Sequence, residues 1–354
     1  MPPNRKIVVS RHLGDKAMFL LRDSLDKDEW QIVQWEENRA VPRAWLEENI
    51  QGAEGILVLL TDKVDDSLLT IAGPNLRIVS TMSVGYDHIE TSALKTRRIK
   101  LGFTPDVLTF AVADLTVLLV LMATRNAGEA VSLVKAGKWP ELGFSPFLLC
   151  GPQIGSGVYG TKPYTVGFIG FGRIAKMALK RLSPYGISRC LYANRRSAKA
   201  SNPLESTEED TALAREMNIG LVHAAPLSYI AAESDLVIVL APGGPETHHI
   251  VDEGFLRKMK PTAVLVNTSR GTLVDTDALV KALQENWIWS AGLDVVEGEP
   301  NITADHPLLQ LPRAVILPHI GSATLDTREA MARLAVENLV NGLKGERIEH
   351  QVSL

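Results

Sequence analysis

The stretch YTVGFIGFGRIAKMALKRLS, residues 164–183, determines how the rest of the chain is interpreted. It begins with a short apolar, partly β-branched run that is typical of a buried strand. It ends with apolar residues spaced for one face of a helix. Between the two lies G-x-G-x-x-A, formed by Gly170, Gly172 and Ala175. A strand, this turn and a helix in succession predict a dinucleotide-binding unit.

Each position of this turn has a chemical reason. Gly170 permits the tight turn, and Gly172 lets the backbone approach a pyrophosphate with no Cβ atom between them. The helix that begins near Arg173 offers unpaired N–H groups and a positive dipole end to the phosphates. Strands and helices also pack tightly in many proteins without a nucleotide, so the neighbouring segments must support the interpretation.

The next predicted strand, residues 188–193, leads into Asn194, Arg195 and Arg196. An NAD site has an acidic residue about twenty residues after the glycines, whereas an arginine suits the 2′-phosphate of NADP. This chain has two arginines there and no acid, and a guanidinium matches phosphate geometry. The sequence therefore favours NADPH, with NADH possible; the structural alternative is a solvated basic loop.

Composition and charge restrict the class of protein. A length of 354 residues suggests about two domains, and 45% hydrophobic residues suffice for large cores. The net charge of −4 indicates neither a nucleic-acid nor a membrane partner. Cys150 and Cys190 alone form no disulfide framework. The start of the chain shows no apolar leader, and the apolar run at 107–123 contains Asp114, so we expect a cytoplasmic protein.

The order of the predicted elements indicates the fold class. Strands at 6–10, 30–35, 53–60 and 76–80 alternate with helices at 15–26, 42–49 and 66–71. This alternation predicts a parallel, doubly wound sheet without a glycine-rich phosphate turn. After long helices at 107–125 and 129–136 and an irregular Gly/Pro-rich segment at 143–162, the turn opens a second such unit. Its later elements are a helix at 206–217, strands at 236–240, 263–267, 291–295 and 315–317, and a helix at 327–343.

Three chemically active side chains follow three successive predicted strands. They are Arg270, Glu299 and His319, and ligands in an open parallel sheet bind beyond the carboxyl ends of the strands. Arg270 can bind a carboxylate through two hydrogen bonds, and His319 can move a proton near neutral pH. Glu299, hydrogen-bonded to His319, would orient the ring and favour its charged form. Each residue alone has an ordinary structural explanation, but the combination beside a dinucleotide turn predicts a catalytic site.

The adjacent pair His248-His249 also requires an interpretation. Neighbouring side chains in extended chain point in opposite directions, and no third ligand is spaced for zinc. We therefore expect no metal site in this protein.

Four segments together resemble one family, the NAD(P)-dependent D-isomer-specific 2-hydroxyacid dehydrogenases. They are VGFIGFGRIAKMALKRLSPYG, VLVNTSRGTLVDTDALVKAL, AGLDVVEGEP and LPHIGSAT. The resemblance extends from VSTMSVGYDHI at 79–89 to Gly345. Within the family the chain is most similar to the glyoxylate/hydroxypyruvate reductases, through TMSVGYDHIE, LYANRR, ILPHIGSAT and its length.

The resemblance implies roles for particular residues. His319 would protonate the substrate carbonyl oxygen, Glu299 would be its partner, and Arg270 would bind the 2-oxo acid. The residues implied for the cofactor are Gly170, Gly172, Arg173, Ile174, Asn194, Arg195, Arg196, Pro242, Thr268, Asp294 and Gly321. The residues implied for the substrate are Val84, Gly85, Arg270, His319 and Ser322.

The resemblance also implies an architecture and an assembly. A discontinuous, flavodoxin-like substrate domain would comprise residues 1–106 and 323–354, and a Rossmann NAD(P)-binding domain residues 107–322. The family is usually dimeric, with the helices near 107–136 at the interface, so a homodimer is expected.

The implied activity is NADPH-dependent reduction of small 2-oxo acids, glyoxylate to glycolate and hydroxypyruvate to D-glycerate. Two alternatives stay open at the level of sequence. One is another D-2-hydroxyacid dehydrogenase of the same family that uses NADH. The other is a cofactor-sensing, corepressor-like binding protein, since such proteins share the fold and similar catalytic residues.

Overall fold

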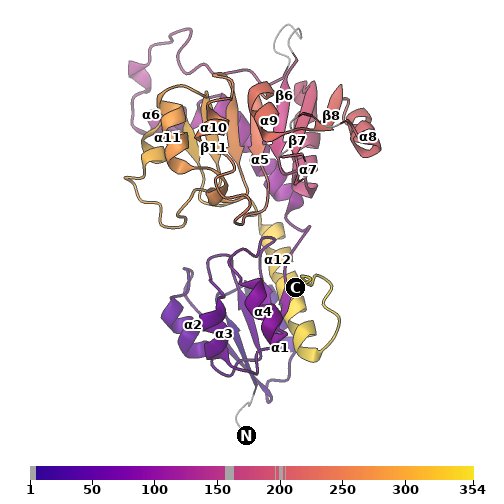
Figure 1. The fold of residues 1–354 in the computed structure, drawn as a ribbon. Helices are drawn as coiled ribbons and strands as arrows, with labels where there is room; N and C mark the ends of the chain where they lie inside the picture. The colour runs from indigo at the N-terminus through magenta and orange to yellow at the C-terminus, as the bar shows by residue number, and fades with distance from the viewer. Residues whose placement is uncertain (1–4, 156–162, 196, 199–201, 204) are drawn as a thin grey trace. The chain divides into compact units, whose positions relative to one another are not determined.

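The chain forms two compact units in a computed structural model that describes residues 5–155, 163–195, 197–198, 202–203 and 205–354. Unit 1 combines Met1–Leu108 with Ser322–Leu354, and unit 2 is the continuous segment Thr109–Gly321 (Figure 1). Unit 1 is therefore built from both ends of the chain.

Unit 1 contains a five-stranded parallel sheet in the order β2-β1-β3-β4-β5. This is the flavodoxin-like order of a doubly wound sheet. The inner strands β3 and β4 are buried along their whole length, as expected where helices cover both faces of a parallel sheet, whereas the edge strand β2 is mostly half-buried. The strands are β1 (Arg5–Val9), β2 (Trp30–Gln34), β3 (Gly55–Val58), β4 (Ile78–Thr81) and β5 (Lys100–Gly102).

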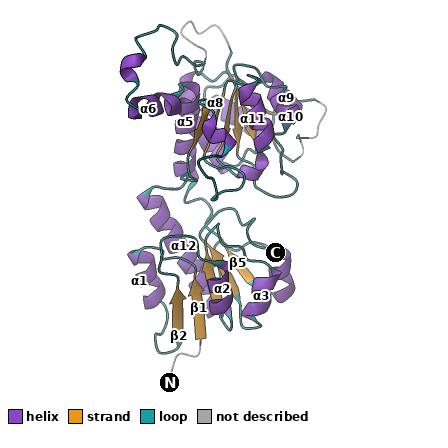
Figure 2. Cartoon of the chain, turned by 90° about the vertical axis from the view of Figure 1, so that its left-hand side faces the viewer, coloured by secondary structure: helices purple, strands orange, loops and turns teal. Residues whose placement is uncertain are grey.

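Helices cover both faces of the unit 1 sheet. On one face α12 packs on α1, β3 and β4, and its Leu339 lies where a Cβ on Gly55 would approach to 2.9 Å. On the other face, side chains such as Val8 and Ile56 share a core with Leu46 and Leu68. Figure 2 shows the strands between these two groups. The helices are α1 (Asp15–Asp23), α2 (Arg43–Ile50), α3 (Asp66–Ala72), α4 (Thr91–Arg97) and α12 (Leu325–Lys344).

Unit 2 contains a seven-stranded parallel sheet in the order β12-β11-β10-β9-β6-β7-β8. The first strand of the unit, β6, lies in the middle, and the order reverses between β6 and β9. This is the Rossmann arrangement with one further strand. The strands are β6 (Thr165–Ile169), β7 (Arg189–Ala193), β8 (Leu221–Ala224), β9 (Leu236–Val239), β10 (Val264–Asn267), β11 (Ser290–Leu293) and β12 (Ala314–Ile316).

Two apolar cores lie on the two faces of the unit 2 sheet. Along β9, Leu236 and Ile238 belong to the core beside α5 and α7, whereas Val237 and Val239 belong to the core beside α9 to α11. Figure 2 shows the strands between α5 and the α9–α11 group. The helices are α5 (Thr109–Thr124), α6 (Ala127–Lys135), α7 (Arg173–Leu182), α8 (Glu208–Glu216), α9 (Leu227–Glu233), α10 (Glu253–Leu256) and α11 (Thr276–Gln284).

The predicted fold class, two doubly wound parallel sheets, is confirmed, with corrections to individual elements. The strand predicted at 53–60 spans only Gly55–Val58, and the helix predicted at 15–26 ends at Asp23. The sequence interpretation did not assign β5, β8, α4, α9, α10 or α11. Several of these elements have four residues or fewer, too short to display a full hydrophobic period.

The long apolar run of unit 2 is helix α5. Within the described residues, no single helix has the length and apolarity to cross a membrane. Thr109–Thr124 and Ala127–Lys135 reach that threshold only as a pair, and they are bent by 72° at the break between them.

Candidate active site

The glycine turn lies where the strand order of unit 2 reverses. Gly170 follows β6 with φ of +86°, and a Cβ there would lie 2.6 Å from the Ala241 backbone, so only glycine fits. Gly172 is different: a Cβ on it would meet nothing within 4 Å. This open space lies directly before α7, whose first residues are Arg173 and Ile174 and whose N-terminus has no side-chain cap. The turn therefore fits the pyrophosphate of a dinucleotide.

The loop after β7 begins with a local turn. The Ser197 amide donates to the Asn194 side-chain oxygen at 2.9 Å, and the Asn194 amide lies 3.0 Å from the Ser197 hydroxyl. Arg195 is exposed at this turn, at the same sheet edge as Gly170, because β7 is parallel to β6. Arg196 lies outside the described residues. No carboxylate occupies positions 194–197.

His319 and Glu299 are in direct contact. The His319 Nδ1 atom lies 2.8 Å from a Glu299 carboxylate oxygen, and about a quarter of each side chain is exposed. Glu299 lies in the loop after β11, and His319 lies in the loop after β12. The sheet pairs these two strands in parallel, which brings the loops together.

The backbone of His319 is held in the left-handed region, with φ of +53°. Its amide donates to the Asp294 carbonyl oxygen at 2.8 Å. The Asp294 carboxylate accepts from the next two amides, those of Ile320 at 2.7 Å and Gly321 at 2.8 Å. Burial raises the pKa of Asp294, although the two amides and His319 act in the opposite direction. Asp294 therefore fixes the loop that positions His319.

Arg270 follows β10, between the strands that lead to the other parts of the site. The Asn267 side-chain amide donates to the Arg270 carbonyl at 2.8 Å, and the Arg270 Nη1 atom donates to the Ser269 carbonyl at 2.9 Å. The following residue, Gly271, lies so close to the loop after β11 that a Cβ would be 2.2 Å from the Val296 carbonyl carbon. The segment that carries Arg270 therefore packs against the segment that leads to Glu299.

Two further residues implied for the cofactor occupy the same sheet edge. Thr268 is buried, and its hydroxyl lies 2.9 Å from that of Thr116. Pro242 is exposed after β9, and its carbonyl accepts a hydrogen bond from the Thr247 hydroxyl at 2.7 Å.

The remaining substrate residues, Val84, Gly85 and Ser322, belong to unit 1. The Ser83 hydroxyl donates to the Gly85 carbonyl at 2.7 Å, which shapes the turn after β4. Their role in binding substrate stays a prediction.

Comparison with known proteins identifies the family. Residues 117–321 match the model of the D-isomer specific 2-hydroxyacid dehydrogenase NAD-binding domain. The chain belongs to the D-isomer specific 2-hydroxyacid dehydrogenase family. It is an NAD(P)-dependent oxidoreductase that acts on the CH–OH group of 2-hydroxy acids.

Relatives span the full chain of this family member. It is 41% identical to the glyoxylate reductase/hydroxypyruvate reductase of Mus musculus, with 100% of both chains covered. It is 38% identical to the glyoxylate reductase of Thermofilum pendens, with 96% of this chain and 92% of the relative covered. A solved NADPH-dependent glyoxylate/hydroxypyruvate reductase from Sinorhizobium meliloti, in complex with NADP and malonate, has a TM-score of 0.77 at 30% identity and covers 99% of this chain and 97% of its own.

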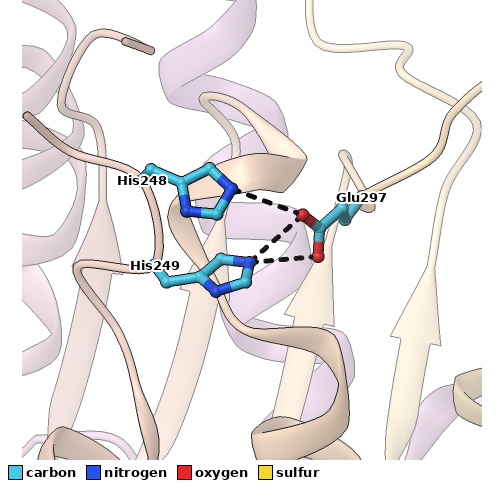
Figure 3. Close-up of side chains that lie close together, drawn as sticks. All are labelled: His248, His249 and Glu297. Atoms are coloured by element: carbon cyan, nitrogen blue, oxygen red, sulfur yellow. Dashed lines mark hydrogen bonds and ion pairs between the residues drawn. The ribbon is translucent and has the colours of Figure 1, made fainter. Parts of the chain in front are cut away.

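The structure of this dehydrogenase also contains a cluster that the sequence interpretation missed. His248, His249 and Glu297 lie side by side at the sheet edge (Figure 3). The expectation that the two imidazoles point apart is wrong, because His249 has φ of +49° and the rings stack with centroids 3.9 Å apart. No local pattern signals this contact, since Glu297 lies 48 residues beyond His249.

Proposed function

We propose that the protein is an NADPH-dependent reductase of small 2-oxo acids that converts glyoxylate to glycolate and hydroxypyruvate to D-glycerate. The observation that carries the proposal is the 2.8 Å contact between His319 and Glu299 at the edge that also bears the glycine turn. The names of the relatives from Mus musculus and Thermofilum pendens support the substrate class.

His319 is the proton donor in this proposal. Its Nδ1–H donates to the Glu299 carboxylate, which leaves Nε2 as the nitrogen that can hold and release a proton. The left-handed backbone and the Asp294 contacts fix the direction of the ring.

Arg270 is the group that binds the acid. A guanidinium can form two parallel hydrogen bonds with a carboxylate, and its charge stabilises the negative charge that develops on the carbonyl oxygen. The packing of Gly271 on Val296 supports this role, because it fixes the segment that carries the arginine.

A nicotinamide cofactor, when bound, supplies a hydride to the carbonyl carbon. The groups proposed to hold it are Gly170, Gly172 and the N-terminal amides of α7, with Pro242, Thr268, Asp294 and Gly321 alongside. The exposed guanidinium of Arg195 and the absence of an acid at 194–197 support a preference for the 2′-phosphate of NADPH.

We also propose that the protein is a homodimer. Several apolar side chains of unit 2 are exposed along α5, α6 and the segment that follows, including Phe110, Val131 and Trp139. Such a concentration of exposed apolar residues indicates a surface that another protein covers. A second copy of the chain is the occupant that agrees with the family resemblance.

Steady-state kinetics test the proposal. The oxidation of NADPH and of NADH is measured separately with glyoxylate, hydroxypyruvate and pyruvate. We expect the highest kcat/KM for NADPH with glyoxylate or hydroxypyruvate. A preference for NADH contradicts the role of Arg195 and leaves the role of His319 intact. Absence of turnover with every acid, despite cofactor binding, contradicts the reductase proposal and favours a cofactor sensor.

A further inference from the structure

The cluster of His248, His249 and Glu297 has the donor atoms of a metal site. The ligand atoms of these three residues all lie within 4.8 Å of one another. The His249 Nε2 atom lies 3.1 Å from Glu297 Oε1, and the His248 Nε2 atom lies 3.8 Å from the same oxygen. Figure 3 shows both imidazoles directed at the carboxylate.

These separations are close to those that a tetrahedral ion requires. Zinc binds imidazole nitrogen and carboxylate oxygen at about 2.0–2.2 Å, so two ligand atoms on a tetrahedral ion lie about 3.3–3.6 Å apart. The two distances in the cluster bracket that range. The rings stack with an interplanar angle of 29°, so the exposed His248 ring must rotate for its nitrogen to meet the same ion as the other two ligands, which leaves a fourth position open to water.

The backbone holds the two imidazoles in place. The His249 amide donates to the Thr272 carbonyl at 2.9 Å, and the Val251 amide donates to the Leu273 carbonyl at 3.0 Å. The loop after β9 is thus attached to the segment after β10, which packs against Val296. Because β9 and β11 are both neighbours of β10, the sheet itself brings the histidines to Glu297.

Further polar groups lie beside the second ring nitrogen of His249 and the second carboxylate oxygen of Glu297. Asp275 Oδ2 lies 3.7 Å from His249 Nδ1, while Asp275 Oδ1 caps α11 through the Ala278 amide. The Thr276 hydroxyl lies 3.5 Å from Glu297 Oε2. A carboxylate on the far nitrogen of a histidine ligand is the usual outer contact of a zinc site, where it orients the ring and raises its basicity.

We propose that His248, His249 and Glu297 bind a divalent transition metal ion, and that Zn²⁺ is the preferred ion. Two imidazoles and one carboxylate suit Zn²⁺, Co²⁺ or Ni²⁺, whereas Mg²⁺ and Ca²⁺ prefer a set of oxygens. The site would join the loop after β9 to the loop after β11 in the same sheet edge. It is independent of the proposed 2-oxo acid reductase activity, and its test uses no turnover.

The test measures metal binding by the whole chain after treatment with a chelator. Isothermal titration with Zn²⁺ and visible absorption with Co²⁺ are compared for the wild type, His248→Ala, His249→Ala and Glu297→Gln. We expect one Zn²⁺ per chain, tetrahedral Co²⁺ bands, and a dissociation constant that rises at least about tenfold in each variant. Circular dichroism verifies that each variant is folded.

Two matched variants control for other histidines near carboxylates. His12 lies 3.5 Å from Asp15 in unit 1, and His319 lies 2.8 Å from Glu299. His12→Ala and His319→Gln should bind Zn²⁺ like the wild type. If the wild type does not bind Zn²⁺ stoichiometrically, the proposal is overturned. It is also overturned if His319→Gln is the one variant that loses Zn²⁺ binding. Because His248 is half exposed, His248→Ala should fold normally, and unchanged Zn²⁺ affinity in that variant also overturns it.

Discussion

His319 combines an unfavourable backbone conformation with a fixed ring. A non-glycine residue with φ near +53° persists only where its surroundings determine it, and here the Asp294 carbonyl and carboxylate do so. Such a conformation is common at functional sites. His249 shares it, with φ of +49°, but His319 is the one whose following amides are bound by the Asp294 carboxylate.

The first prediction concerns the proton that His319 is proposed to donate. His319→Gln keeps the size of the side chain but removes the acid. We expect kcat for glyoxylate reduction to fall about 10²- to 10⁴-fold, because general acid catalysis contributes a factor of that size. The dissociation constant for NADPH, measured by fluorescence titration, should stay within about threefold of the wild type. Near-normal turnover would rule out His319 as the proton donor.

The second prediction concerns the choice of cofactor. Arg195→Ser removes the exposed guanidinium at the turn after β7. We expect KM for NADPH to rise at least about tenfold, since a charged hydrogen bond to phosphate contributes about 1.5–3 kcal/mol. KM for NADH should change little, and kcat should be retained. An equal rise for both cofactors would show that Arg195 supports the loop and not the 2′-phosphate.

The individual residues differ in how far the sequence could predict them. Gly170 was predictable because the G-x-G-x-x-A pattern and its positive φ are local features, although the Ala241 backbone that also excludes a Cβ lies far along the chain. The stacked pair His248-His249 was not, because the positive φ of His249 depends on a hydrogen bond to Thr272 that no short window of sequence reveals. A local rule predicts a local conformation and fails where a distant segment decides.

At the scale of elements, the start of α3 depends on one carboxylate. Asp65 is the N-cap of α3, and its side chain accepts from the Leu68 amide at 3.1 Å and from Arg43 at 2.7 Å. Partial burial acts to raise the pKa of Asp65, but these hydrogen bonds outweigh it and hold the pKa well below its usual range. The ionised form is therefore favoured in the folded state.

The third prediction is the pH dependence that follows. A carboxylate with a depressed folded pKa contributes stability above its unfolded pKa of about 3.9, and this contribution is lost as the pH falls toward the folded value. Asp65→Ala should lower the free energy of unfolding of unit 1 by about 1–2 kcal/mol near pH 7. Urea denaturation followed by circular dichroism should show the gap from wild type narrowing below about pH 4. The exposed Asp28→Ala variant should have the same free energy of unfolding as the wild type. If the difference between Asp65→Ala and the wild type were equal near pH 7 and below about pH 4, that result would contradict the argument.

The pattern of elements was predictable where they are long and periodic. Helix α5 was expected at 107–125 and spans Thr109–Thr124, because sixteen apolar-rich residues leave little ambiguity. Helix α9 and strand β8 were not assigned, since Leu227–Glu233 and Leu221–Ala224 each contain too few apolar positions for a clear period. In the described sheet β8 is the edge strand, and its pairing with β7, more than its local sequence, defines it as a strand.

At the scale of the whole molecule, the exposed aromatic residues of unit 2 lead to the fourth prediction. Phe144 and Phe147 are almost fully exposed in the segment after α6, close in sequence to the exposed Trp139. Sedimentation equilibrium should give a mass about twice the 38.6 kDa of the chain. Phe144→Asp with Phe147→Asp should shift the protein toward the monomer, because charges oppose apolar burial.

A matched control separates this surface from exposed apolar residues in general. Phe19 on α1 of unit 1 is also exposed, at 68%. Phe19→Asp should leave the mass unchanged. A monomeric wild type, or equal dissociation by Phe19→Asp, would contradict a dimer formed through the segment after α6.

The composition of unit 1 from both ends of the chain has a consequence for synthesis on the ribosome. Unit 2 is one continuous segment and can fold as soon as Gly321 has emerged. Unit 1 cannot be completed at that point. Leu339 and Leu343 of α12 cover the sheet at Gly55, and the ribosome adds them nearly 300 residues after Gly55. During that interval the nascent β1–β5 segment presents an uncovered apolar face. We expect it to be a target for chaperones, and translation that stops before Leu325 should yield a folded unit 2 attached to an unfinished unit 1.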